Sequence, residues 1–424
     1  MKEEQVLQKQ NKEKVSKEFS IKEHNSDNKK DYNWLSPFGV FFVILLSFIV
    51  YAGSFSTAAK AEYNPAPGFT LENLSWENGQ PPSKMNLEWE KDGYKKILSE
   101  PGSIIAVKNS SVERLHSENG ETIWSYKRPD SEICDVIGYN SIIYTLFNSG
   151  NGCNDITALD SATGEYVAQA QYGTQSDLGK LVGAEESIAI VTPHLVRLVR
   201  SSDLVPQATF GDTLTPIYDT DQEVKNCDIS DVAIGEKVFA IASFCDNDDT
   251  YKVRLVEKEP EESSQGVITK TIDTASNRPV TLPIINNEQI IFVVQDEKYE
   301  ASVWNIAEDE PFSVISYILE PGHIGYQHEE MSYFGYVWRI GDWVRYQASS
   351  EDLTKGKDVA GAIGKPILAG DKLLVPTYEG LAFVEFSNDE QYDIDVNIPV
   401  SDSFAFAGKT FIAHGEDGII RAYQ

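Results

Sequence analysis

Two kinds of hydrophobic pattern divide the chain. Residues 38–51 are almost entirely apolar and lie within an uncharged run that extends from residue 32 to residue 59. From about residue 84 onward, apolar and polar positions alternate in short runs separated by Gly, Asn, Asp and Ser. The first pattern is typical of a helix that spans a bilayer, and the second is typical of β-strands. We therefore expect one transmembrane helix followed by an all-β domain.

The charges on either side of the uncharged run predict its orientation. Lys29 and Lys30 precede the run, whereas the residues beyond it are predominantly acidic. Positively charged flanks stay in the cytoplasm. We therefore expect residues 1–31 to be a disordered cytoplasmic tail, residues 32–59 to be a signal anchor in the plasma membrane, and the remainder to be extracytoplasmic.

Two features follow the predicted anchor. The sequence Ala59-Lys60-Ala61 has the small-x-small form of a signal-peptidase site, so cleavage after Ala61 is an alternative to a permanent anchor. Residues 60–83 contain four prolines and no regular hydrophobic pattern, and this composition predicts an extended linker.

The β-rich part repeats itself. Each copy has two strands, a turn that contains Gly-Glu, and a third strand; the two clearest copies comprise residues 103–108, 112–116, 118–121 and 122–127, and residues 141–146, 155–160, 162–165 and 166–169. Weaker copies continue to the C-terminus. Four-stranded sheets repeated every roughly 40–45 residues are typical of a β-propeller.

The number of copies predicts how the propeller closes. The strand pairs predict eight blades of four antiparallel strands, but the last copy ends at Gln424 without an outer strand. Residues 84–90 have the alternation of such a strand, so we expect this segment to complete the last blade in a propeller that spans residues 84–424. Seven blades are an alternative, because the copy around residues 323–355 is irregular.

The turns carry a family resemblance. The Gly120-Glu121 and Gly164-Glu165 turns, together with Trp124, resemble the repeat of pyrroloquinoline-quinone (PQQ)-type propellers. The resemblance covers residue 84 to the end and is strongest in the first two copies. The repeat of this chain is also similar to that of the propeller lipoproteins of outer-membrane assembly. The membrane-anchored arrangement resembles that of envelope proteins of Gram-positive bacteria, especially actinobacteria.

What the resemblance implies depends on the member of the family. The similar lipoproteins are scaffolds, which implies a non-enzymatic, protein-binding role in envelope assembly. Quinoprotein dehydrogenases carry adjacent cysteines and calcium ligands, whereas this chain has no adjacent cysteine pair and its tryptophan repeats are mostly degraded. We therefore expect no PQQ and no other cofactor.

The four cysteines predict two disulfide bonds. Cys134 and Cys153 are 19 residues apart, Cys227 and Cys245 are 18 apart, and each pair brackets the first two strands of a copy. Neighbouring antiparallel strands bring such positions together, and an exported domain favours oxidation. We expect both pairs to bond locally and to occupy the same places in their copies. A zinc site is disfavoured because no CxxC spacing occurs.

The charge of the chain is concentrated in the exported part. The formal net charge is −30; residues 1–31 contain eight Lys and seven acidic residues, which leaves 28 basic and 59 acidic residues beyond residue 59, a net of −31. Such acidity disfavours binding to nucleic acid or to anionic lipid surfaces. Partners with neutral or cationic surfaces fit it better.

Motifs for chemistry are missing from the sequence. The six histidines are scattered without metal-ligand spacing, and no nucleophile elbow, Walker loop or dinucleotide-binding fingerprint occurs. An acidic cluster between Asp246 and Glu262 lacks the spacing of a calcium loop, and we interpret it as a solvated loop. We predict that the chain is not an enzyme and holds no metal.

One aromatic cluster is the candidate interaction surface. Seven aromatic residues fall within 21 positions: Tyr326, Tyr333, Phe334, Tyr336, Trp338, Trp343 and Tyr346. Aromatic side chains on alternating strand positions pack between blades or form recognition surfaces.

These features lead to a functional prediction with two alternatives. We predict a membrane-anchored scaffold that binds other envelope proteins through its propeller. A sensor of a glycan or other small ligand is one alternative, and a PQQ-dependent dehydrogenase is the other.

Overall fold

The structure is a computed structural model that describes residues 57–66, 82–100, 103–173, 176–211, 226–260, 266–295, 299–307, 311–317, 331–332, 335–340, 343–347, 357–363, 366–369, 372–377, 379–385, 391–398, 403–407 and 409–424. The described residues belong to one compact unit of the chain, residues 57–424. The predicted tail and all but the last three residues of the predicted anchor lie outside the described residues. Within the described part, no helix is long and apolar enough to cross a membrane.

The first sheets contain the regular copies of the repeat. In the order in which the strands pair, these four sheets are β1 (Glu62–Asn64), β6 (Thr122–Lys127), β5 (Ser111–His116), β4 (Ser103–Val107) and β3 (Lys96–Glu100); β10 (Tyr166–Gln171), β9 (Cys153–Asp160), β8 (Ile142–Asn148) and β7 (Glu132–Tyr139); β11 (Lys180–Ala184), β12 (Ser187–Val191), β13 (Leu195–Arg200) and β14 (Pro206–Gly211); and β15 (Asp228–Ile234), β16 (Val238–Phe244), β17 (Lys252–Glu257) and β18 (Ile268–Asp273). Every pairing is antiparallel.

The remaining strands form four further sheets. They are β19 (Val280–Ile285), β20 (Gln289–Gln295), β21 (Tyr299–Asn305) and β22 (Pro311–Tyr317); β23 (Met331–Ser332), β24 (Gly335–Ile340), β25 (Trp343–Gln347) and β26 (Lys357–Ala360); β27 (Ile367–Ala369), β28 (Lys372–Thr377), β29 (Gly380–Glu385) and β30 (Gln391–Ile394); and β31 (Ser403–Ala407), β32 (Thr410–His414), β33 (Ile420–Tyr423) and β2 (Leu87–Lys91). The described strands therefore form eight antiparallel sheets.

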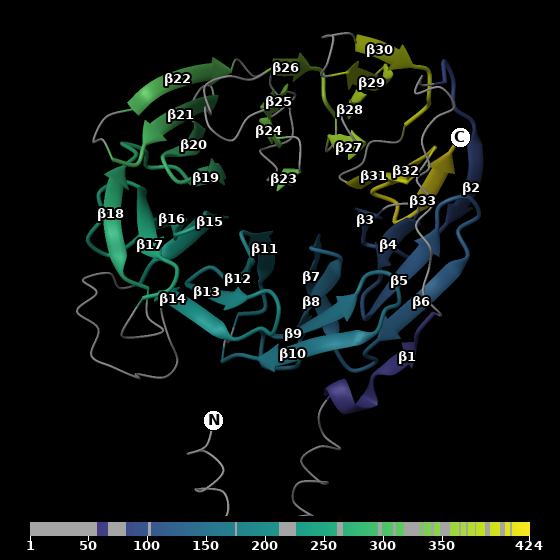
Figure 1. The fold of residues 1–424 in the computed structure, drawn as a ribbon, viewed down its shortest axis with the longest axis horizontal. Helices are drawn as coiled ribbons and strands as arrows, with labels where there is room; N and C mark the ends of the chain where they lie inside the picture. The colour runs from purple at the N-terminus through teal and green to yellow at the C-terminus, as the bar shows by residue number, and fades with distance from the viewer. Residues whose placement is uncertain are drawn as a thin grey trace, which may run out of the picture. The chain divides into compact units, whose positions relative to one another are not determined.

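The sheets surround a common centre, and the innermost strands are β3, β7, β11, β15, β19, β23, β27 and β31 (Figure 1). Inner strands of successive sheets pack against one another: β7 against β11, β11 against β15, β15 against β19, β27 against β31, and β31 against β3. The last of these contacts joins the end of the chain to its beginning. This arrangement is a β-propeller.

The first and last segments of the propeller contribute to one sheet. β2 pairs antiparallel with β33, the last strand of the chain, in the register Glu90 to Arg421. The N–H of Asn86 donates to the Gln424 carbonyl at 2.8 Å, and the N–H of Gln424 donates back at 3.0 Å. Between this sheet and the first, Ser99 Oγ donates to the Phe406 carbonyl at 3.0 Å. β2 is therefore the outer strand of the sheet that ends the chain.

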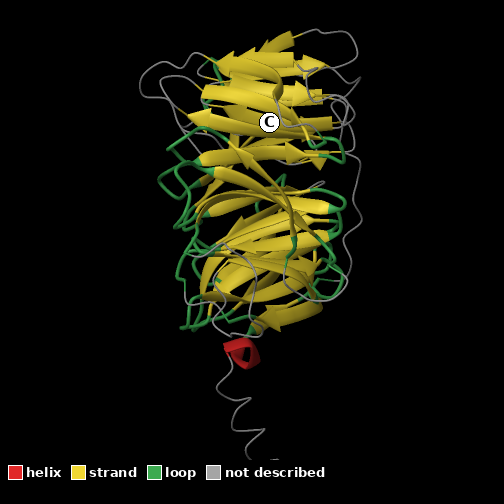
Figure 2. Cartoon of the chain, turned by 90° about the vertical axis from the view of Figure 1, so that its left-hand side faces the viewer, coloured by secondary structure: helices red, strands yellow, loops and turns green. Residues whose placement is uncertain are grey.

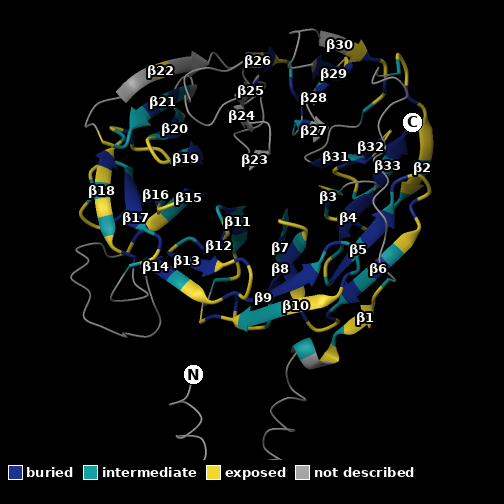
Figure 3. Ribbon diagram, viewed as in Figure 1, coloured by how far each residue is buried: buried dark blue, intermediate teal, exposed yellow. Residues whose placement is uncertain are grey.

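The hydrophobic core lies between adjacent sheets. All five residues of each of the strands β4, β12 and β32 are buried, whereas the outer strand β10 is half-buried or exposed throughout. Figure 3 shows buried middle strands such as β4 and β12 between half-buried inner strands such as β3 and β7 and more exposed outer strands such as β10. One apolar cluster joins Ile104 and Leu115 of the first sheet to Ile412 and Ile420 of the last. Inter-sheet burial of this kind holds the ring together.

The segment predicted as a linker includes regular structure at its start. η1 (Thr57–Lys60), a short 3-10 helix, precedes β1, which adds a fifth strand outside β6. A segment of three residues is too short for its alternation to be detected in the sequence.

Candidate functional site

The aromatic cluster is described only in part. Tyr326 and Tyr333 lie outside the described residues, whereas Tyr336 and Trp338 lie on β24 and Trp343 and Tyr346 on β25. The register of these two neighbouring strands places Trp338 opposite Arg345, Ile340 opposite Trp343, and Val337 opposite Tyr346. Phe334 also lies outside the described residues, so the structure brings four of the seven aromatic residues of the cluster onto one strand pair.

The surroundings of this strand pair include one buried charge. Arg345 is 5% exposed, and its Nη1 donates to the two carboxylate oxygens of Asp358 on β26 at 3.0 and 3.1 Å. Val344 beside it is fully buried. Val344 and Arg345 in the middle of β25 are therefore buried in the propeller.

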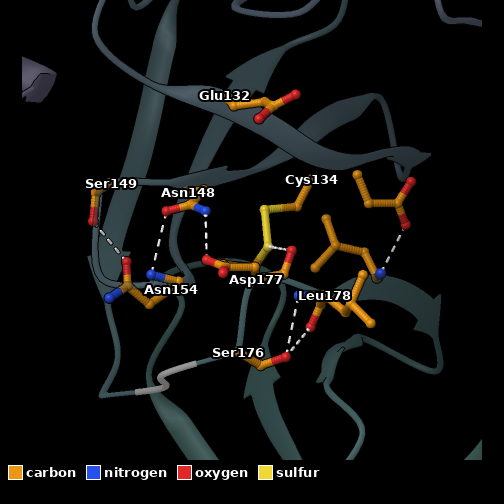
Figure 4. Close-up of a disulfide and its surroundings, with 12 residues drawn as sticks. Glu132, Cys134, Asn148, Ser149, Asn154, Ser176, Asp177 and Leu178 are labelled. Carbon is orange, nitrogen blue, oxygen red and sulfur yellow. Dashed lines mark hydrogen bonds between the residues drawn. A yellow bond between two sulfur atoms is a disulfide. The ribbon is translucent and has the colours of Figure 1, made fainter.

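The predicted disulfide bonds are confirmed, although the two differ in position. Cys134 bonds to Cys153 with the Cα atoms 6.1 Å apart, and Cys227 bonds to Cys245 with the Cα atoms 4.0 Å apart. Cys227 and Cys245 flank the neighbouring strands β15 and β16, as predicted. Cys134 and Cys153 instead join β7 to β9 across the end of β8 (Figure 4). The expectation of equivalent places is therefore wrong.

A β-bulge explains the difference between the disulfides. In β7 the register shifts between Ile133 and Asp135, so Cys134 is the bulged residue. In β15 the shift falls between Ile229 and Asp231, and the bulged residue is Ser230. Ser230, rather than Cys227, is the counterpart of Cys134. A bulge directs neighbouring side chains away from their regular positions.

The aspartate after each bulge fastens three sheets together. Asp135 accepts a hydrogen bond from Lys96 Nζ of the preceding sheet at 2.8 Å and one from the Leu181 N–H of the following sheet at 2.8 Å. Asp231 does the same with Lys180 Nζ at 2.7 Å and the Leu282 N–H at 2.8 Å. These two aspartate clamps join the inner strands of the first five sheets.

Tryptophans of the outer strands lie against the Gly-Glu turns of the next sheet. Trp124 Nε1 donates to the Ser161 carbonyl at 2.9 Å, and a methyl group at Gly164 would lie 2.7 Å from the indole. Trp89 on β2 makes the same contact, donating to the Ser117 carbonyl at 2.9 Å, with Gly120 against its ring. Because β2 and β6 present the same residue to the same turn, β2 belongs to the repeat.

The third junction uses different residues for the same contacts. Trp89 and Trp124 are the first paired residues after the bulge of their strands, and the corresponding residue of β10 is Ala168. The turn position of Gly164 is taken by Leu204, which is 2% exposed with φ of 60°. At this junction the turn carries the large residue, Leu204, and the outer strand carries the small one, Ala168, which is the reverse of the other two junctions.

A tyrosine replaces the indole donor at this junction. Tyr144 on β8 donates its hydroxyl to the Ser201 carbonyl at 2.8 Å, which is the acceptor that corresponds to Ser161. Burial raises the pKa of Tyr144 to about 12, so the hydroxyl stays protonated at neutral pH. The contact is therefore retained although the tryptophan is lost.

One charged pair is fully enclosed between the first two sheets. Arg128 is fully buried, and its Nη1 lies 3.0 Å from Asp155 Oδ2, outside hydrogen-bond geometry. Nε donates to the Tyr126 hydroxyl at 2.8 Å and Nη2 to Thr157 Oγ1 at 2.5 Å. Burial raises the pKa of Asp155, while the charge of Arg128 opposes that rise. These contacts of Arg128 are all with other residues of the propeller.

The acidic cluster also serves the fold where it is described. Asp248 accepts the Cys245 N–H at 2.8 Å and holds Arg254 Nη2 with both carboxylate oxygens, at 2.9 and 2.6 Å. Asp246 accepts from Asn226 Nδ2 at 2.6 Å. Among the described residues, no three His, Cys, Asp or Glu side chains gather as a metal site.

Comparisons with known proteins agree with the fold. No protein-family model and no curated protein matches the sequence. The solved structures similar to this chain include the computationally designed Ika8 protein (TM-score 0.51, 10% identity, covering 80% of this chain and 98% of that one). They also include BamB from Moraxella catarrhalis (TM-score 0.47, 11% identity, covering 80% of this chain and 99% of that one). At these identities the likeness concerns the fold alone.

Proposed function

We propose that this protein is a non-enzymatic scaffold: an eight-bladed propeller with PQQ-type repeats, held outside the plasma membrane by a single N-terminal span, that binds other proteins of the cell envelope. The fit of Trp89 and Trp124 to the Gly-Glu turns supports the PQQ-type repeat. The eight sheets of the described strands, with β2 paired to β33, support eight blades.

The observation that carries the scaffold role is that charged side chains such as Asp135 and Asp231 are engaged in contacts within the fold. Asp135, Asp231, Asp155 and Asp248 each hold a basic side chain, and each contact joins strands within or between sheets. Groups fixed in this way stabilise a rigid ring rather than supply an exchangeable proton or a ligand site. A rigid ring with exposed outer strands suits the display of binding surfaces.

The strand pair β24–β25 is the binding surface that we propose. Trp338 and Trp343 are residues of the type that dominates binding energy at protein interfaces. Anchoring at the membrane raises the local concentration of such a surface near other membrane proteins. A partner with a neutral or cationic surface matches the acidic exported part.

Site-specific photo-crosslinking in intact cells tests this function. A photoreactive amino acid at Trp338 or Trp343 of the full-length chain should give discrete adducts with envelope proteins, whereas one at the exposed Val314 of β22 should not. Equal or absent adducts at all three positions would contradict the proposal that β24–β25 is the binding surface. A saturable absorbance change on titrating the purified chain with PQQ would contradict the non-enzymatic role.

A further inference from the structure

Residues 57–66, which we name the rim strap, lie along the outer edge of two sheets. β1 pairs antiparallel with β6, with Tyr63 opposite Tyr126 and the two rings in edge-to-face contact at 6.5 Å. Farther along, the N–H of Ala66 donates to the carbonyl of Thr163, in the turn that precedes β10, at 3.1 Å. The strap therefore crosses from the first sheet to the second.

Ion pairs and packing hold the start of the strap. Lys60 Nζ lies 2.5 Å from Asp130 Oδ2, and Glu62 accepts from Lys127 Nζ at 3.0 Å. Ala61 packs against the apolar cluster shared by the first two sheets. Figure 2 shows η1 beyond the outermost strands, at the rim of the propeller and over neither of its faces. The chain thus enters the propeller through its edge.

The length of the chain limits how far this rim can lie from a membrane anchor. The last three residues of the uncharged run already belong to η1. From Tyr51, where the most apolar stretch ends, only six residues lead to Thr57, and these reach about 20 Å at most. The outer edges of β6 and β10 must therefore lie close to the membrane surface if the apolar stretch that ends at Tyr51 spans the bilayer.

The exposed residues of this rim suit a lipid interface. Tyr63 is 41% exposed, Tyr166 is 56% exposed and Val167 is 43% exposed. Tyr166 and Val167 begin β10, directly after the turn to which the strap is joined by the hydrogen bond from Ala66 to Thr163. Tyrosine rings favour the headgroup region, where one end is apolar and the other is wet.

The charge of the strap also differs from that of the exported part as a whole. The strap contains one lysine, Lys60, and one acid, Glu62, and their partners Asp130 and Lys127 cancel them. Residues beyond 59 carry 28 basic and 59 acidic side chains, a net of −31. The strap and its ion-pair partners are therefore neutral, although Glu165 and Asp160 act electrostatically on Tyr63 beside them.

We propose that the rim formed by the strap, β6 and β10 faces the membrane, with Tyr63, Tyr166 and Val167 at the headgroups. The axis of the ring then runs parallel to the bilayer, and both faces of the propeller remain open to partners. This orientation rests on the proposed membrane anchor.

Lipid-dependent fluorescence quenching of the full-length chain tests the orientation. The native cysteines are paired, so a single fluorophore can be attached at V167C, or at the control positions V267C and V314C on other outer-strand segments, which are 50% and 52% exposed. In phosphatidylcholine vesicles that contain a headgroup quencher, quenching at position 167 should exceed that at both controls several-fold.

The outcomes separate the two proposals. Equal quenching at the three positions of a chain that floats with the vesicles overturns the orientation and leaves the anchor standing. A full-length chain that does not float with vesicles overturns the anchor and, with it, the orientation.

Discussion

The indole of Trp124 lies directly against Gly164, with Nε1 bonded to the carbonyl of Ser161 at 2.9 Å. Gly164 has φ of 73°, a conformation that a side chain disfavours, and a methyl group there would meet the indole at 2.7 Å. A side chain at position 164 would therefore cost free energy in two ways, through backbone strain and through overpacking against the indole.

Gly164→Ala should destabilise the protein by about 3 kcal/mol, the sum of backbone strain and overpacking. Gly150 is the matched control, because its φ is 93° but nothing lies within 4 Å of an added methyl group. Gly150→Ala should cost about 1 kcal/mol, from strain alone. Urea unfolding of both variants checks this, and equal losses would show that the indole contact is not tight.

The exchange of residues at the third junction predicts a coupled pair. Leu204→Gly should leave a cavity that costs about 2–3 kcal/mol, and Ala168→Trp should cost about 1–3 kcal/mol through overpacking. The double variant should cost clearly less than the sum, because it recreates the arrangement of Trp124 with Gly164. Additive losses in a double-mutant cycle would refute the equivalence of the junctions.

The aspartate clamps should contribute more to stability than exposed ion pairs do. Asp231 is 2% exposed, and Asp231→Asn removes its charge while keeping an acceptor for the Leu282 N–H. We expect a loss of about 2 kcal/mol. Glu132→Gln, which breaks the exposed pair with Lys95, should cost about 0.5 kcal/mol or less. Similar unfolding midpoints for the two variants would argue against the clamp.

Asp273 should make stability depend on pH in acid. Hydrogen bonds from Lys252, Thr250 and the Ala275 N–H lower the pKa of Asp273 to about 2. A carboxyl with a lowered pKa stabilises the folded state above its unfolded pKa, near 4, and this contribution is lost as pH falls towards 2. Asp273→Asn should therefore lose less stability than the natural chain between pH 4 and pH 2, as measured by urea unfolding. An unchanged acid slope would contradict the assignment.

Much of the fold could be predicted from the sequence because its signals are local. The short runs rich in apolar and β-branched residues in strands such as β4 and β5, and the Gly-Glu turns at Gly120 and Gly164, are each defined by residues that are close together in the sequence. The cysteine pairs also follow from their short separation. The bulge at Cys134, in contrast, depends on how β7 meets β8 and has no signal in the sequence.

The contacts between sheets could not be predicted, because their partners are far apart in the chain. Asp231 lies 51 residues from both Lys180 and Leu282. At the third junction, Ala168 stands in place of the tryptophan and Leu204 in place of the glycine, and in the sequence this looks like degeneration of the repeat. In the structure, Tyr144 on another strand makes the hydrogen bond that the tryptophan would have made. β1 could not be recognised from the sequence, because its three residues lie in a proline-rich segment. Of the candidate interaction surface, Tyr326 and Tyr333 lie outside the described residues.

Strands β2 and β33, from the two ends of the propeller, form one sheet and close the ring. Hydrogen–deuterium exchange of the full-length protein tests this closure most directly, because β33 is the only strand among the described residues that pairs with β2. The amides that bond the two strands, from Asn86 to Lys91, should exchange as slowly as those of β6. Exchange of this segment as fast as that of an unpaired chain would contradict the closed ring.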